Sequence, residues 1–181
     1  MLNIVTIEGK KYIQDVGFGS SGPTRPVLLV ENEISTNVGN QEMRLVYDTI
    51  PDFTHSDRKL WIYQHRNGVD QPWLPTYAFS EMEFTPNDFM IMNYFTSTHR
   101  SSWFTYSVVC VRMILEDGDI VGDITLVGGL VKKRIRGKSE VLVVCKSEEH
   151  RVKALEEFLD VKLSSAEREG IRGLPSELLD A

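Results

Sequence analysis

Short stretches rich in β-branched and aromatic residues recur along the first half of the sequence. They cover residues 2–7, 12–16, 27–30, 43–49, 59–65 and 73–83. Turn-forming residues such as Gly9, Pro51-Asp52 and Asn67-Gly68 stand between them. Short strands with regular turns are typical of antiparallel barrels and sandwiches. We therefore expect a β-barrel-like domain over residues 1–84 that opens with a hairpin.

A helix start follows at residues 85–88, Thr-Pro-Asn-Asp. Threonine is a good N-cap, proline fits the first helical position, and Asp88 faces the positive end of the helix dipole. The pattern predicts a helix to about Phe95, inside a connecting region over residues 85–100.

The remaining residues, 101–181, predict a smaller domain of sheet and helices. Strands are expected at 103–115, 119–127 and 139–146, and amphipathic helices after Ser147 and Ser164. The fold class is therefore α+β, with mostly antiparallel strands.

Charge and hydropathy restrict the partners. The formal net charge is -6, and phosphate surfaces attract proteins with an excess of Lys and Arg, so we expect no nucleic acid and no anionic membrane as partner. The most apolar stretches, 108–115 and 124–131, are shorter than the ~20 residues that a membrane span needs. The first residues have neither a basic start nor a sustained apolar run, so we expect no secretion signal and a cytoplasmic location.

Five cations stand within residues 132–138, Lys-Lys-Arg-Ile-Arg-Gly-Lys. A run of this kind can bind phosphate, which suggests a nucleotide contact. The run is expected at a turn beside a strand that bears Asp117, Asp119 and Asp123. Charge pairing between strands is therefore the favoured explanation.

Cys110 and Cys145 each lie in an apolar predicted strand. Burial there raises the pKa of a thiol, so we expect two inert, reduced cysteines and no nucleophile among them. The candidate bases that could have served such a nucleophile are His55, His65, His99 and His150. These histidines have neither the close spacing nor the cysteine partners of a zinc site, so no metal is expected.

The segment with the most chemical content is residues 12–19, Tyr-Ile-Gln-Asp-Val-Gly-Phe-Gly. A strand here delivers Asp15 directly before a glycine loop. A carboxylate so placed can orient a histidine and stabilise its imidazolium, while unobstructed loop amides can approach a phosphate or acyl oxygen. An aspartate that caps a glycine-rich turn is the simpler interpretation of these residues alone.

This segment resembles the arylamine N-acetyltransferase family, whose members carry Tyr-hydrophobic-x-Asp-Val/Ala-Gly-Phe-Gly on the second strand of such a hairpin. Similar residues continue in order at 44–45, 61–66, 77–79, 86–89, 92–93 and 101–105, and then at Arg151, Leu155, Phe158 and Leu163. The resemblance implies a cysteine-protease-like superfold with an α/β lid domain over residues 101–181. It also implies a Cys-His-Asp triad that transfers acetyl from acetyl-CoA to an aromatic amine or hydrazine, as in xenobiotic metabolism.

Asp15 matches the triad aspartate of that family. The family's histidine aligns immediately before Met1, and its cysteine belongs to a helical region that precedes the hairpin. We therefore expect this chain to be the C-terminal two thirds of such a protein, truncated by a start at an internal methionine. It should be inactive alone, because cysteine and histidine act as a unit. A non-catalytic isoform or paralogue that binds CoA or a partner is the alternative.

The resemblance also implies a surface for CoA. Its residues are the backbone of Gly17, Phe18 and Gly19 and the side chains of Ser101 and Phe104. Phe104 as a plain core aromatic is the alternative for that residue. Arg100 replaces the family's usual proline, and an exposed loop position is favoured for it over a phosphate contact. Without the family's N-terminal helices an apolar face should be exposed, which predicts self-association.

Overall fold

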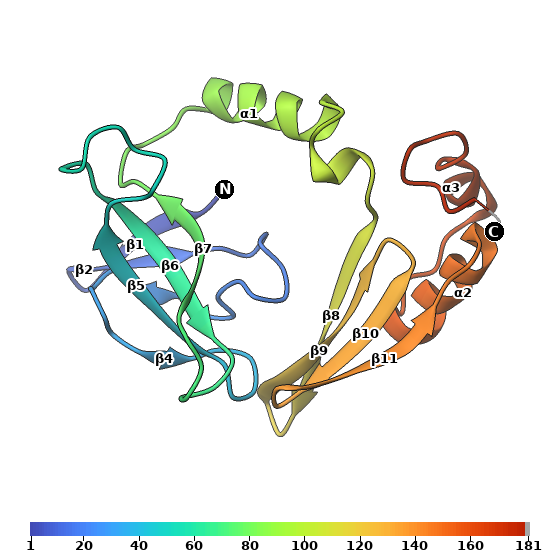
Figure 1. The fold of residues 1–181 in the computed structure, drawn as a ribbon, viewed down its shortest axis with the longest axis horizontal. Helices are drawn as coiled ribbons and strands as arrows, with labels where there is room; N and C mark the ends of the chain where they lie inside the picture. Colours follow the sequence, from blue (N-terminus) through green and yellow to red (C-terminus); the bar gives the residue numbers. More distant parts are fainter. Residues whose placement is uncertain (180–181) are drawn as a thin grey trace. The chain divides into compact units, whose positions relative to one another are not determined.

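The computed structural model describes residues 1–179, which divide into two compact units (Figure 1). Unit 1 contains Met1–Glu83 together with Leu115–Val121, and unit 2 contains Phe84–Ile114 and the chain from Gly122 onward. Residues 115–121 belong to unit 1 because, for example, the carbonyl of Ile120 accepts a hydrogen bond from the Gly39 amide at 2.8 Å.

Unit 1 consists of two antiparallel sheets. The three-stranded sheet has the order β1 (Asn3–Ile7), β2 (Lys10–Gln14), β3 (Val27–Leu28), and the four-stranded sheet has the order β4 (Ser35–Thr36), β5 (Glu42–Asp48), β6 (Leu60–Arg66), β7 (Leu74–Phe79). The N-terminal hairpin and the mostly antiparallel fold are confirmed. The described strands form two sheets and no closed barrel, because β3 and β4 are each too short to continue the ladder from one sheet into the next.

The two sheets of unit 1 share one hydrophobic core. Its buried members are Ile13, Val27, Met43, Leu45 and Tyr63. They come from β2, β3, β5 and β6, so strands of both sheets contribute. Each fully buried large side chain contributes about 1.5–3 kcal/mol of transfer free energy, which holds the β2–β3 pair against the larger sheet.

Unit 2 contains one antiparallel sheet and its helices. The elements in chain order are α1 (Pro86–Thr98), the 3₁₀ turn η1 (Trp103–Thr105), β8 (Val109–Glu116), β9 (Asp119–Val127), β10 (Leu130–Ile135), β11 (Lys138–Val144), α2 (Glu148–Leu159) and α3 (Ser165–Glu169). The sheet order is β11-β10-β9-β8. Sequential antiparallel neighbours need only short turns, and Asp117-Gly118 and Gly128-Gly129 supply two of them.

Helix α1 begins where its sequence predicts and ends later. The Asp88 carboxylate accepts hydrogen bonds from the backbone amide and hydroxyl of Thr85, both at 2.7 Å. Beyond the predicted end at Phe95, the hydroxyls of the next three residues donate to carbonyls one turn back, for example Thr96 to Met92 at 3.0 Å. These hydroxyls bond to carbonyls that already accept from backbone amides of the helix, and the helix ends at Thr98, where the His99 amide donates to the Phe95 carbonyl at 3.0 Å.

Two predicted boundaries in unit 2 are wrong. The strand expected from residue 103 begins at Val109, because Trp103–Thr105 forms a 3₁₀ turn in which the Thr105 hydroxyl donates to the Ser102 carbonyl at 2.8 Å. The basic run lies mainly on β10 and not in a turn. Only its Arg136-Gly137 portion turns the chain, and both of these residues have positive φ angles.

The position of β10 explains the basic run. Arg134 lies opposite Asp123 in the β9–β10 register, and its Nε donates to an Asp123 carboxylate oxygen at 3.0 Å. Asp123 is only 4% exposed, so it needs this partner. Lys133 pairs more loosely with Glu140 across the β10–β11 register, at 4.0 Å. Charge pairing between strands is therefore confirmed for these two cations.

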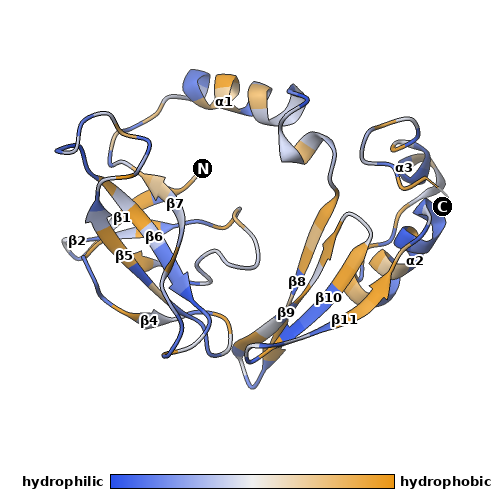
Figure 2. Ribbon diagram, in the orientation of Figure 1, coloured by the Kyte–Doolittle hydropathy of each residue, from blue (hydrophilic) through white to orange (hydrophobic). Residues whose placement is uncertain are grey.

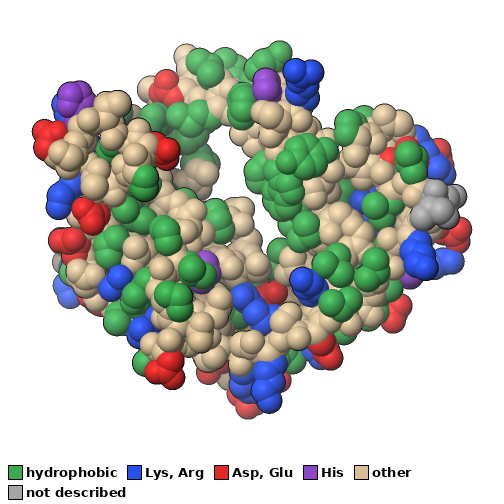
Figure 3. Space-filling view, viewed as in Figure 1, with side chains coloured by type: hydrophobic (Ala, Val, Ile, Leu, Met, Phe, Trp, Pro, Cys, Tyr) green, Lys and Arg blue, Asp and Glu red, His purple; other side chains and the backbone are tan. Residues whose placement is uncertain are grey.

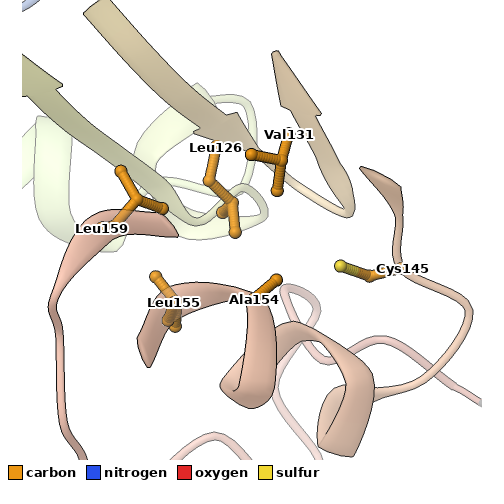
Figure 4. Packing of buried hydrophobic residues seen from close by; sticks show 6 residues of the cluster. All are labelled: Leu126, Val131, Cys145, Ala154, Leu155 and Leu159. Carbon is orange, nitrogen blue, oxygen red and sulfur yellow. The ribbon is translucent and has the colours of Figure 1, made fainter. Parts of the chain in front are cut away.

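Helix α2 covers the core of unit 2 (Figure 4). The clustered side chains are Leu126, Val131, Cys145, Ala154, Leu155 and Leu159. Ser147 caps the helix as predicted, since its hydroxyl accepts from the His150 amide at 3.2 Å. Arg151 is 1% exposed and bonds to the Glu148 carboxylate, while it donates to the Ser176 carbonyl at 2.9 Å. This buried pair ties the segment after α3 to α2.

Candidate functional site

Asp15 lies at the point where β2 leaves its sheet. The last β1–β2 pair is Asn3 with Gln14, so the chain is free to turn at the next residue. One Asp15 carboxylate oxygen, Oδ1, accepts a hydrogen bond from the Gly17 amide at 3.0 Å. This is the turn-capping bond of the simpler interpretation, and it also orients the half-buried carboxylate. Because the bond uses one oxygen, it is compatible with a second partner at the other.

Two phenols, one on a buried and one on a half-buried tyrosine, adjoin the Asp15 carboxylate. Tyr63 on β6 and Tyr77 on β7 stack with ring centroids 5.1 Å apart. Burial raises the pKa of both hydroxyls well above their ordinary value, and the negative charge of Asp15 raises it further. The Tyr63 hydroxyl donates to the Ser21 carbonyl at 3.1 Å. The Tyr77 hydroxyl is near enough to feel the charge of Asp15, yet it has no hydrogen-bond partner of ordinary geometry among residues 1–179.

The glycine loop after Asp15 is closely packed. The Gly22 amide donates to the Gly19 carbonyl at 3.0 Å, and Gly19 has a φ of 100°, which favours glycine. A Cβ at Gly22 would lie 2.8 Å from the Cβ of Phe18. The Phe18 ring contacts Tyr77 with centroids 5.1 Å apart and remains 45% exposed. Gly17, Phe18 and Gly19 are thus exposed residues of a loop that is held by its own hydrogen bonds.

A buried asparagine anchors the far side of this loop. Asn37 is 3% exposed, and its side-chain amide donates to the Gly22 carbonyl at 2.9 Å and to the Gln41 side chain at 2.6 Å. Its side-chain oxygen accepts from the amide and hydroxyl of Thr24 at 3.0 and 2.9 Å. Neither Asn37 nor Gln41 belongs to a motif that the sequence reveals. No local signal distinguishes Asn37 from a turn asparagine, since its loop partners lie 13 and 15 positions away.

The other predicted CoA residues, Ser101 and Phe104, belong to unit 2. The Ser101 hydroxyl and His99 Nδ1 are 2.8 Å apart, and the His99 ring stacks on Phe95 with centroids 4.7 Å apart. Phe104 is 66% exposed and contacts Trp103 at 5.5 Å. The alternative of a plain core aromatic is therefore wrong for Phe104. Arg100 lies in an exposed turn, which agrees with the exposed loop position that the sequence favours.

The cysteines have the environment that their sequence predicts. Burial raises the pKa of both thiols, and both pack in or against the core of unit 2. The His65 ring nitrogen Nδ1 is 2.8 Å from the Thr76 hydroxyl and is thus engaged on its own sheet. Across residues 1–179 no three His, Cys, Asp or Glu side chains form a group that could hold a metal ion. None of the helices described is long and apolar enough to span a membrane.

Known proteins resemble this chain in sequence and in fold. A family model described as N-acetyltransferase matches residues 1–168. The chain is 36% identical over 188 residues to the N-malonyltransferase FDB2 of Fusarium pseudograminearum and 33% identical over 187 residues to that of Gibberella moniliformis. These matches cover 98% of this chain but 54% and 53% of the relatives. The chain thus spans about half the length of the curated relatives it matches.

Solved structures share the fold at lower identity. The arylamine N-acetyltransferase of Salmonella typhimurium matches with a TM-score of 0.73 at 22% identity, over 94% of this chain and 59% of that one. The enzyme of Mycobacterium abscessus matches with a TM-score of 0.77 at 18% identity, over 92% and 55%. That of Mycobacterium marinum in complex with CoA matches at 0.69 and 23%, over 86% and 52%. Since the family model spans nearly the whole sequence and the fold agrees, the chain belongs to the arylamine N-acetyltransferase family.

Proposed function

We propose that this chain contributes the triad aspartate and part of the CoA surface to transfer of acetyl from acetyl-CoA to an aromatic amine or hydrazine. The observation that supports this most is the setting of Asp15. Its carboxylate stands at a strand end, one oxygen is held by the Gly17 amide, and two stacked phenols adjoin it. An aspartate that only caps the turn needs the bond from the Gly17 amide and not the two phenols.

In this proposal Asp15 positions the family's histidine. The carboxylate oxygen not bonded to Gly17 accepts the imidazole N–H, which fixes the tautomer and stabilises the imidazolium formed when the cysteine thiol gives up its proton. The thiolate then attacks the thioester carbonyl, the bond from that carbon to the CoA sulfur breaks, and the imidazolium protonates the departing thiolate. Tyr63 and Tyr77 remain neutral in this site, because their pKa values are raised. They therefore add no negative charge that would compete with Asp15 for the imidazolium.

The exposed residues of the glycine loop would contact CoA. The backbone of Gly17, Phe18 and Gly19 is accessible and is held by the bonds at Gly22 and Asn37. A fixed loop loses little conformational entropy when a ligand binds. In unit 2, Ser101 and the exposed ring of Phe104 are further proposed CoA contacts, carried by the family resemblance.

A malonyl donor is the second candidate. It is favoured by the curated relatives, which are N-malonyltransferases 33–36% identical to this chain. The bond changes are the same as for acetyl transfer. The donor differs in the free carboxylate at the distal end of its acyl group, which a site can select with a cation.

The test begins with the protein isolated from its natural source. Intact mass and peptide mapping would establish whether it exceeds 20.7 kDa and contains a cysteine and a histidine upstream of Met1. We expect such a protein to transfer acetyl or malonyl to an aromatic amine, with release of free CoA. Asp15→Asn should lower kcat/KM about 10³-fold or more, while Asp57→Asn, a change of the same kind in an exposed turn, should leave it unchanged.

Two results would contradict this proposal. A natural protein of 181 residues would leave Asp15 without its two partners, and the non-catalytic binding module would then be the function to pursue. Equal effects of Asp15→Asn and Asp57→Asn on kcat/KM, in a protein that does transfer acyl groups, would show that Asp15 only caps the turn.

A further inference from the structure

Arg25 is the only Lys or Arg between Lys11 and Arg44. It stands in the loop that joins β2 to β3, the same loop that contains Asp15 and the exposed residues Gly17, Phe18 and Gly19. Figure 1 shows this loop extending away from the three-stranded sheet. The cation therefore belongs to the segment on which the proposed acyl chemistry depends.

The backbone on both sides of Arg25 is fixed. The preceding residue, Thr24, is bound through its amide and hydroxyl to the buried Asn37. The following residue is Pro26, whose ring restricts φ, and Val27 then enters β3 and the core. The fold therefore fixes the position of the Arg25 Cα atom before any ligand binds.

The strand register brings Arg25 to the same end of the sheet as Asp15. Ile13 on β2 pairs with Val27 on β3. Two residues outward from this pair, one arm of the loop reaches Asp15 and the other reaches Arg25. Both charged residues therefore stand at the base of the loop, where its two arms leave the sheet.

The Arg25 side chain is exposed, and within residues 1–179 it makes no hydrogen bond or ion pair. The only acid of the loop, Asp15, uses one oxygen for the Gly17 amide. An exposed guanidinium on a fixed backbone retains its fork of N–H donors for a ligand. That fork matches the two oxygens of a carboxylate.

We propose that Arg25 binds the free carboxylate of a dicarboxylic acyl group such as malonyl, and so selects that donor over acetyl. The inference rests on the proposed function with malonyl in place of acetyl as the preferred donor, because it assumes that a CoA thioester lies along this loop. An acetyl group ends in a methyl and offers the guanidinium nothing to bind. Arg25 is accordingly a specificity-determining residue, and Asp15 retains its role toward the histidine.

Titration calorimetry of the 181-residue chain tests this with three probes: CoA, acetyl-CoA and malonyl-CoA. We expect wild type to bind malonyl-CoA more tightly than acetyl-CoA by about tenfold, the size of one partly screened charged contact. Arg25→Gln should remove this preference and leave the affinities for CoA and acetyl-CoA unchanged. Arg25→Lys should keep part of it, because the charge remains but the fork is lost.

Arg58→Gln is the matched control, since it removes an exposed arginine from a different turn of unit 1 and should change none of the three affinities. A wild-type chain that binds both thioesters equally would overturn the role of Arg25 and leave the proposed function standing. An equal loss for all three probes in Arg25→Gln would assign Arg25 to CoA itself and also overturn the inference. A chain that binds no probe would overturn the proposed CoA surface and the donor selection with it.

Discussion

Tyr63 and Tyr77 stack almost parallel, with an angle of 17° between ring planes, but their hydroxyls differ. The Tyr63 hydroxyl bonds to the Ser21 carbonyl and accepts from Asn37, whereas the Tyr77 hydroxyl is buried, lies close to the Asp15 carboxylate and makes no hydrogen bond of ordinary geometry within residues 1–179. The two phenols therefore lie in the same environment but differ in the hydrogen bonds that they make. This difference can be measured with conservative substitutions.

Tyr63→Phe should destabilise the chain by about 1–3 kcal/mol, because it leaves the buried partners of that hydroxyl unsatisfied. Tyr77→Phe should change the free energy of unfolding by less than about 1 kcal/mol, because its hydroxyl lies near the Asp15 carboxylate without a hydrogen bond of ordinary geometry to lose. Urea unfolding followed by circular dichroism measures both values. A loss at Tyr77 as large as that at Tyr63 would reveal a strong bond to Asp15 and contradict the expectation.

Alkaline pH should destabilise unit 1. The folded pKa values of Tyr63 and Tyr77 lie above the ordinary value of 10.0, so the unfolded phenols ionise first. The stability from these groups is fully present below pH 10.0 and declines as the pH rises above it. Thermal melts at increasing pH should show this decline, and the double variant Tyr63→Phe/Tyr77→Phe should flatten it. An unchanged slope in the double variant would assign the decline to other groups.

Gly122→Ala should disrupt unit 2. A Cβ at this position would lie 1.9 Å from the Arg134 carbonyl oxygen on the neighbouring strand β10. Because backbone must move to relieve this overlap, we expect a loss of about 3 kcal/mol or more. In Gly17→Ala the new Cβ would be 3.9 Å from an Asp15 oxygen, an ordinary contact, so that variant is the control. Similar unfolding midpoints in urea for the two variants would refute the steric argument.

Neither cysteine should react readily in the folded chain. Burial raises the pKa of both thiols, and Cys145 is only 6% exposed. At neutral pH we expect slow alkylation by iodoacetamide in the native state and rapid modification of both residues in denaturant. Intact mass over time measures the rates. Fast native alkylation of Cys110 or Cys145 would reopen the question of a nucleophile within this chain.

The isolated chain should self-associate through helix α1. None of the α1 residues is buried, and its exposed apolar side chains include Met90, Ile91, Tyr94 and Phe95. Figures 2 and 3 show this apolar character along the helix and at the surface. Sedimentation velocity should show larger species as concentration rises, and Ile91→Glu should reduce them.

Asn87→Glu provides the control for that experiment, because it adds the same charge on α1 at an exposed polar position. It should leave the size distribution unchanged. A wild-type chain that stays monomeric at every concentration would contradict the expectation.

Local patterns were sufficient for most elements of the fold. The N-terminal hairpin, the Thr85 and Ser147 caps and the hairpin around Asp117-Gly118 depend on residues only a few positions apart. The strand within the basic run, residues 132–135, is not evident from local patterns. Val131 lies in the core and Arg134 lies opposite Asp123 on the neighbouring strand. The run is understood as a strand only once this pairing is known.

The sequence by itself determined the N-terminal hairpin and the starts of helices α1 and α2, and it placed Asp15 at the end of a strand before a glycine loop. Only the tertiary structure decided what surrounds that carboxylate. Tyr77 is 62 positions from Asp15 and Asn37 is 15 from Gly22, yet they adjoin the carboxylate and anchor its loop. Glycine is required at positions 22 and 122 because neighbouring atoms leave no room for a Cβ, and not because φ is positive there. Such contacts form when sheets and loops pack together, because burial and hydrogen-bond satisfaction are settled between segments that no local pattern relates.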